Sequence, residues 1–152
     1  MGSSLILVDS PGGKLEARDI GFEAGGVLER AGAQVAFHTD DWITDSRHFL
    51  RMAALAVRAG MTREGALRAL TIEPARMLDL GDRIGSIEVG KDADLILLDG
   101  DPFSVYTKVQ ETWVNGVQVF DRSNAEDLLF ATGGMGAGQS RAHTSCCDGE
   151  GN

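Results

Sequence analysis

The residues best suited to chemistry stand together at positions 38–41, which read His-Thr-Asp-Asp. They close a short apolar run, 35–38, of the kind that forms a buried strand. In parallel α/β sheets the carboxyl ends of the strands carry the chemistry, and a carboxylate there can bind a metal ion or move a proton. Because side chains alternate along a strand, His38 and Asp40 are expected on one face and Asp41 on the other. The plain alternative is that Asp40 or Asp41 only caps the helix that follows.

A second segment imitates a phosphate-binding loop. Residues 85–91 match the spacing G-x-x-x-x-G-K, but Asp92 stands where the motif requires Ser or Thr. A carboxylate at that position would repel phosphate, and no helix is expected after Lys91. The sequence therefore argues against a phosphate site here.

Two adjacent cysteines, Cys146 and Cys147, lie near the C-terminal end. Neighbouring Cα atoms are ~3.8 Å apart, which is too close for an ordinary disulfide. With His143 and Asp148 the two thiols could bind a metal ion, but only from a fixed loop. The Gly- and Ser-rich surroundings favour a mobile tail instead.

The elements that would position residues 38–41 alternate between strand and helix. Apolar runs at 5–8 and 35–38 predict buried strands, and apolar residues at helical spacing predict helices over about 18–31 and 46–59. Gly32 and Gly60 stand where glycine ends a helix, and Thr44 or Asp45 is the expected N-cap of the second. Two such units imply parallel strands covered by helices.

The rest of the chain changes character. Thr62 should cap a helix to about residue 70, and Pro74 should open a short helix over 74–78. Strands are expected at 95–98 and 105–109, followed by a hairpin of 111–114 and 117–120 around Asn115-Gly116. After Asp121 the chain turns polar and Gly-rich, which predicts a loosely ordered tail.

This organisation leaves the predicted parallel sheet incomplete. Two strand–helix units have two open sheet edges and no opposing layer, and proteins cover such edges or close them into a barrel. We therefore expect the chain to be the end of a larger fold.

Charge and hydropathy exclude two classes of partner. The net charge of -9 argues against nucleic-acid binding, which needs a basic face. No apolar run approaches the ~18 residues of a membrane span, and the first residues lack the features of a signal peptide.

Three segments together resemble the C-terminal part of the metal-dependent amidohydrolase superfamily. Residues 82–102, with Gly-Lys-Asp-Ala-Asp-Leu at their centre, and Val-Asn-Gly at 114–116 are similar to its C-terminal signature. Residues 66–78 resemble the helix that precedes that signature, and residues 38–40 resemble its last metal-binding motif. The similarity is strongest to the branch with imidazolonepropionase and prolidase-type dipeptidases.

The resemblance implies a (β/α)₈ TIM barrel beside a small β-sandwich. Residues 1–80 would hold the last two βα units and the following helices, 81–122 the sandwich strands and 123–152 the tail. By position Asp40 would bind a divalent metal, expected to be zinc, and shuttle a proton, with Asp41 as runner-up. The reaction would be hydrolysis of a C–N bond in a small amide, cyclic amide or dipeptide.

The departures from the family pattern limit what the chain can do alone. The family's His-x-His pair is missing, and the histidines are His38, His48 and His143. One carboxylate cannot hold a catalytic zinc ion, which takes three or more protein ligands. We expect an inactive isolated chain that self-associates or pairs with the missing barrel. The alternative is a non-catalytic α/β interaction module derived from the same fold.

Overall fold

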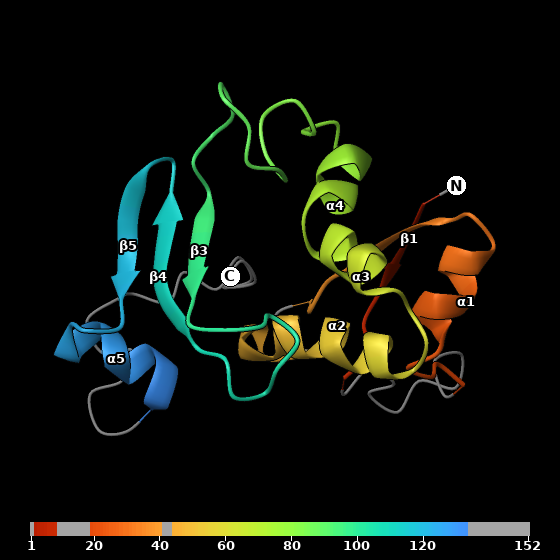
Figure 1. Cartoon of the computed structure of the whole chain (residues 1–152), viewed down its shortest axis with the longest axis horizontal. Coiled ribbons are helices and arrows are strands. Elements are labelled where there is room, and N and C mark those ends of the chain that lie inside the picture. The colour runs from red at the N-terminus through yellow and green to blue at the C-terminus, as the bar shows by residue number, and fades with distance from the viewer. Residues whose placement is uncertain (1, 9–18, 41–43, 134–152) are drawn as a thin grey trace, which may run out of the picture.

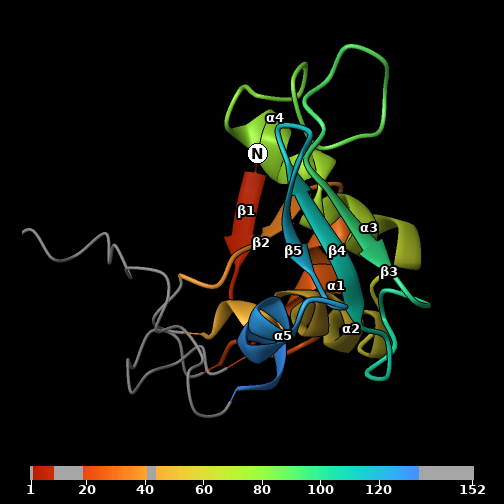
Figure 2. The ribbon, with the colours of Figure 1, turned by 90° about the vertical axis from the view of Figure 1, so that its left-hand side faces the viewer.

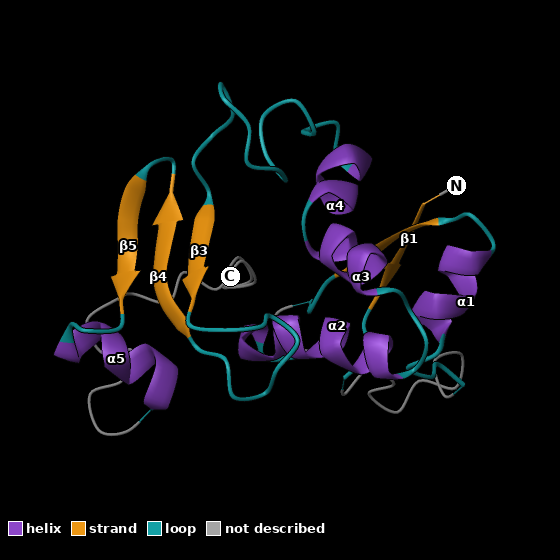
Figure 3. Ribbon diagram, viewed as in Figure 1, coloured by secondary structure: helices purple, strands orange, loops and turns teal. Residues whose placement is uncertain are grey.

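The computed structural model describes residues 2–8, 19–40 and 44–133. Within these residues a parallel strand pair with helices lies beside a three-stranded antiparallel sheet (Figure 1). Helices dominate the first half of the chain and strands the second, as the sequence predicts (Figure 3).

The parallel pair consists of β1 (Gly2–Leu5) and β2 (Gln34–Phe37). Leu5 lies opposite Phe37, and the Leu5 carbonyl accepts a further hydrogen bond of 3.1 Å from the His38 N–H. The parallel arrangement was predicted, but the first strand lies earlier than 5–8. Residues 6–8 are apolar because they pack on the core, where Leu7 is buried, and not because they belong to the ladder.

Helix α1 (Ala24–Arg30) is shorter than predicted but ends as expected. Gly32 takes a positive φ of 75°, and the N–H groups of Gly32 and Ala33 bond the carbonyls of Glu29 and Leu28. Gly26 lies against the turn at Gly60, where an added Cβ would come within 2.9 Å of backbone atoms. The glycines that weaken this helix therefore permit its close approach to that turn.

Three further helices cover the pair: α2 (Phe49–Arg58), α3 (Arg63–Leu70) and α4 (Ile72–Met77). A 3₁₀ turn (Ser46–His48) precedes α2, and its N-cap is Asp45, not Thr44. Thr62 caps α3 as predicted. The predicted apolar face of α2 forms the centre of the core, with Met52, Ala53 and Ala56 fully buried.

The second sheet has the order β3 (Leu95–Leu98), β4 (Val109–Val114) and β5 (Val117–Asp121). Asn115 and Gly116 form the predicted hairpin turn, with φ values of 51° and 75°. The strand expected at 105–109 is wrong, since β4 begins only at Val109. Asp101 and Ser104 accept hydrogen bonds from the N–H groups two residues ahead, which produces turns in its place.

The Gly-Lys-Asp-Ala-Asp-Leu segment braces this hairpin. The Asn115 N–H donates to the Asp94 carboxylate at 2.8 Å, and the Gly116 N–H donates to the Ala93 carbonyl at 3.1 Å. Lys91 is bonded internally, to the Gly81 carbonyl and the Ser86 hydroxyl. The segment is therefore structural, as predicted for Asp94, and its lysine already has partners within the loop.

Part of the predicted loose tail is helical. Helix α5 (Ala125–Thr132) begins after Asn124, whose side chain accepts from the N–H groups of Glu126 and Asp127. Figure 2 shows α5 at one end of the β3–β5 sheet. The glycine content of the tail hid this capping signal. Cys146, Cys147, His143 and Asp148, named above as a possible metal cluster, lie outside the described residues. No helix in the described ranges is long and apolar enough to cross a bilayer.

Candidate functional site

Asp40 lies just beyond the carboxyl end of β2, where the sequence places it. Its side chain is exposed and its backbone takes a positive φ of 51°, a left-handed conformation that Asp and Asn tolerate better than most residues. The alternation expected for His38 and Asp40 therefore does not extend to residue 40. Asp41, the runner-up, lies outside the described residues.

His38 is tied to the neighbouring strand. Its Nδ1 lies 2.6 Å from the hydroxyl oxygen of Ser4 in β1, so the residue that directly follows β2 contacts the neighbouring strand. This contact holds the imidazole ring near the carboxyl end of β2. The sequence predicted the position of His38 but not its partner, because no spacing rule relates residues 4 and 38.

Thr44 fixes the loop that carries Asp40, a role that sequence reasoning missed. The Thr44 side chain is fully buried, and its hydroxyl donates to the Val8 carbonyl. Its N–H donates to the Thr39 carbonyl at 3.1 Å, which draws the two ends of the 39–44 loop together. A threonine before a helix also fits a helix cap, so no local signal separates the two roles.

Asp45, the next carboxylate along the chain among the described residues, is not a second candidate for proton transfer. Arg47 donates hydrogen bonds to it from its side chain and its backbone N–H, and these bonds hold the pKa of the Asp45 carboxyl well below its usual range. A carboxylate bound in this way serves as the cap of the 3₁₀ turn and not as a proton acceptor.

The described residues do not make a metal centre by themselves. In residues 2–8, 19–40 and 44–133 no three His, Cys, Asp or Glu side chains lie together as a ligand set. A catalytic zinc ion takes three protein ligands and a hard divalent cation takes more oxygens. Among the described residues, Asp40 therefore does not belong to a set of three such side chains.

Comparison with known proteins gives the family. The Amidohydrolase family matches residues 4–120, and the chain belongs to that family. The chain is 40% identical to the imidazolonepropionase of Picrophilus torridus over 77 residues, which is 46% of this chain and 20% of that protein. The predicted resemblance to the amidohydrolases is confirmed at the level of the family.

Solved structures of related enzymes resemble this chain as well. An amidohydrolase from Thermotoga maritima superposes with a TM-score of 0.69 at 40% identity, over 72% of this chain and 28% of that one. A Xaa-Pro dipeptidase with bound methionine superposes with a TM-score of 0.57 at 28% identity, over 64% of this chain and 25% of that one. The chain thus spans 20–28% of the length of these three relatives.

Proposed function

We propose that this chain is the C-terminal portion of a metal-dependent enzyme that hydrolyses C–N bonds. Its β1–α1 and β2–α2 units would be the last two of a (β/α)₈ barrel, and β3–β5 would be part of the adjoining β-sandwich. The observation that supports this most is the position of Asp40. Asp40 follows the parallel strand β2. In barrels of this kind the active site lies at the carboxyl ends of the strands.

In this proposal Asp40 accepts the proton of the attacking water and passes it to the leaving nitrogen. Hydrolysis of an amide needs such a transfer, because the nitrogen is a poor leaving group until it is protonated. An exposed carboxylate on a loop held by Thr44 is suited to that task. The metal ion that the family implies would need ligands beyond the described residues, so we assign it no step here.

The proposed substrates are small amides, cyclic amides or dipeptides. The names of the relatives support this range, since one is an imidazolonepropionase and another a Xaa-Pro dipeptidase. In barrels the loops after all the strands set the specificity, and two of them fall within this chain.

The test is to express the chain together with the coding sequence that precedes Met1 in its genome and to assay metal-supplemented amide and dipeptide hydrolysis. We expect Asp40→Asn to abolish turnover, because asparagine keeps the left-handed backbone but cannot accept the proton. Asp79→Asn is the matched control, since Asp79 also has a positive φ, 57°, but follows α4. If both variants lose activity to the same extent, or if neither loses activity, Asp40 does not have the proposed role.

The second candidate function is a non-catalytic interaction module. The observation that favours it is the missing ligand set among the described residues. The genomic sequence on the 5′ side of the Met1 codon separates the two candidates. A His-x-His pair and further histidines at strand ends there support the enzyme, whereas an in-frame stop with nothing related upstream supports the module.

A further inference from the structure

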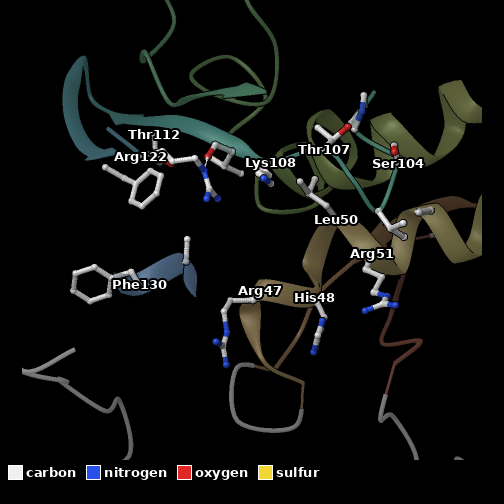
Figure 4. A pocket seen from close by; sticks show the side chains of 16 residues that line it. Arg47, His48, Leu50, Arg51, Ser104, Thr107, Lys108, Thr112, Arg122 and Phe130 are labelled. Carbon is white, nitrogen blue, oxygen red and sulfur yellow. Dashed lines mark hydrogen bonds between the residues drawn. The ribbon is translucent and has the colours of Figure 1, made fainter. Parts of the chain in front are cut away.

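A hollow of about 440 Å³ lies between the two parts of the molecule and away from Asp40. Four segments form its walls: the start of α2, the turns at 102–108, strands β4 and β5 with Arg122 just after them, and α5 (Figure 4). The space is large enough for a small organic molecule.

The charge of this hollow is opposite to that of the chain. Acidic residues outnumber Lys and Arg by 23 to 14 in the sequence, yet no Asp or Glu is among the described residues that line the hollow. Its lining includes Arg47, Arg51, Lys108 and Arg122. A concave site with one sign of charge concentrates ligands of the other sign.

Two of these cations lie on the sheet side of the hollow. Figure 4 shows Lys108 and Arg122 beside the sheet, with the Arg122 guanidinium extending toward the side of Phe130, whereas Arg47, in the 3₁₀ turn before α2, extends away from the sheet. Arg47 is also paired with Asp45. Within the described part of the chain, neither Lys108 nor Arg122 has a carboxylate within salt-bridge distance.

The backbone orients Arg122. Its Nε donates to the Val109 carbonyl at 2.6 Å, and its own N–H donates to the Gln110 carbonyl at 2.8 Å. These bonds place the guanidinium against the backbone of β4 at Val109 and leave its terminal N–H groups for another acceptor. A planar guanidinium held in this way suits the two oxygens of a carboxylate or phosphate.

The remaining walls are mostly apolar. Phe120, Phe130, Leu50 and Val109 line the hollow around the two cations. A bound molecule would therefore meet positive charge at one end and aromatic and aliphatic surface along its body.

We infer that this hollow binds a small organic anion: an aromatic or branched aliphatic group bearing a carboxylate or phosphate. The anion contacts Arg122 and Lys108, and the apolar group lies between Phe120, Phe130 and Leu50. The site does not depend on Asp40 or on the proposed hydrolysis.

The experiment is calorimetric titration of the full chain with phenylacetate and phenyl phosphate. Benzyl alcohol tests the apolar group alone and inorganic phosphate the headgroup alone. We expect one saturable site that binds at least one of the two anions about tenfold more tightly than benzyl alcohol. The anion that binds more tightly identifies the headgroup.

Variants assign the binding to this hollow. Arg122→Gln and Lys108→Gln should each weaken binding about fivefold or more, and Arg58→Gln, at the far end of α2, should leave it unchanged. Lys108→Gln keeps the fold intact, because Lys108 bonds Asp99 through its backbone N–H. The inference is overturned by the absence of saturable binding or by binding that both pocket variants retain. Equal binding of benzyl alcohol, or of inorganic phosphate and phenyl phosphate, would also overturn it.

Discussion

At the scale of single residues, hydrogen-bond partners identify the carboxylates that have structural roles. Asp40 is exposed at the end of β2, whereas Asp45 is bound by Arg47 and Asp94 by the Asn115 N–H. The sequence could place Asp40 and Asp41 at a strand end because apolar runs predict strands, and the family resemblance ranked Asp40 before Asp41. It could not predict the partners of Ser4, His38 or Thr44, because these contacts join residues more than thirty positions apart.

Glu73 shows what a buried carboxylate does in this fold. It is one of the few buried charged residues, and it accepts hydrogen bonds from Arg68, Arg76 and Gln34. Burial raises the pKa of its carboxyl, but the bonds from Arg68 and the charges of Arg68 and Arg76 outweigh burial and hold the pKa below 4.5. At pH values above 4.5 the Glu73 carboxyl is therefore charged and stabilises the contact between α4 and β2.

We predict that Glu73→Gln weakens this region by about 1–3 kcal/mol at pH 7, less than for a fully buried pair because both arginines are half-exposed. Because the folded-state pKa is lowered, the contribution is complete above pH 4.5 and is lost as the pH falls through the folded value. Amide hydrogen exchange in β2 and α4, measured between pH 7 and 3.5, tests both statements.

The matched control is Glu64→Gln on the exposed side of α3, which should leave the exchange of β2 and α4 unchanged. A pH dependence of local stability that persists in Glu73→Gln would show that another carboxylate is responsible.

At the scale of elements, caps and turns were the most predictable features. Gly32, Thr62 and Asn115-Gly116 have the backbone or hydrogen bonds that their residue types demand. The failures share one physical reason. Residues 6–8 and 105–107 are apolar, aromatic or β-branched, but they pack or turn without pairing. Strand pairing depends on a partner that the local sequence does not contain.

The hairpin offers a test of the family signature. We predict that Asp94→Ala destabilises the β4–β5 turn by about 1 kcal/mol, because the Asn115 N–H loses its charged acceptor. Exchange of the Asn115 and Gly116 amides should accelerate about fivefold.

Asp82→Ala, an exposed aspartate in the same signature, is the control and should leave both amides unchanged. If Asp94→Ala and Asp82→Ala behave alike, the signature does not brace the hairpin in the way described here.

At the scale of the whole molecule, the first consequence concerns activity. We predict that the purified chain alone hydrolyses no amide or dipeptide in a panel supplemented with Zn²⁺ or Mn²⁺. The described residues contain no three-ligand set, and one carboxylate does not retain a catalytic ion. Turnover that is abolished both by a chelator and by Asp40→Ala would contradict this and indicate a site assembled between chains.

The last prediction concerns association. Within the described part of the chain, β1 and β2 form a two-stranded sheet whose outer edges have no strand partner. The apolar side chains of β2 are nevertheless buried, contrary to the expectation that the missing opposing layer would leave apolar side chains of the parallel pair exposed. Exposed apolar side chains are found in the loops, such as Ile87 and Val89, and on the second sheet, where Val117 is 64% and Ile96 46% exposed.

Covering that surface should drive self-association of the isolated chain. Each large aliphatic side chain that becomes buried contributes ~1.5–3 kcal/mol, so a few of them match the ~5–15 kcal/mol net stability of a domain. Open strand edges add a template for pairing between copies. We predict that the chain is not a cooperatively folding monomer, and light scattering with thermal unfolding and ANS binding measures this.

Val117→Lys and Ile96→Lys, which place charges on the exposed sheet, should reduce association, whereas Val105→Lys in the 102–108 turns should not. A monodisperse 16.2 kDa species with one sharp transition and no ANS binding would show that these residues fold as a self-sufficient unit.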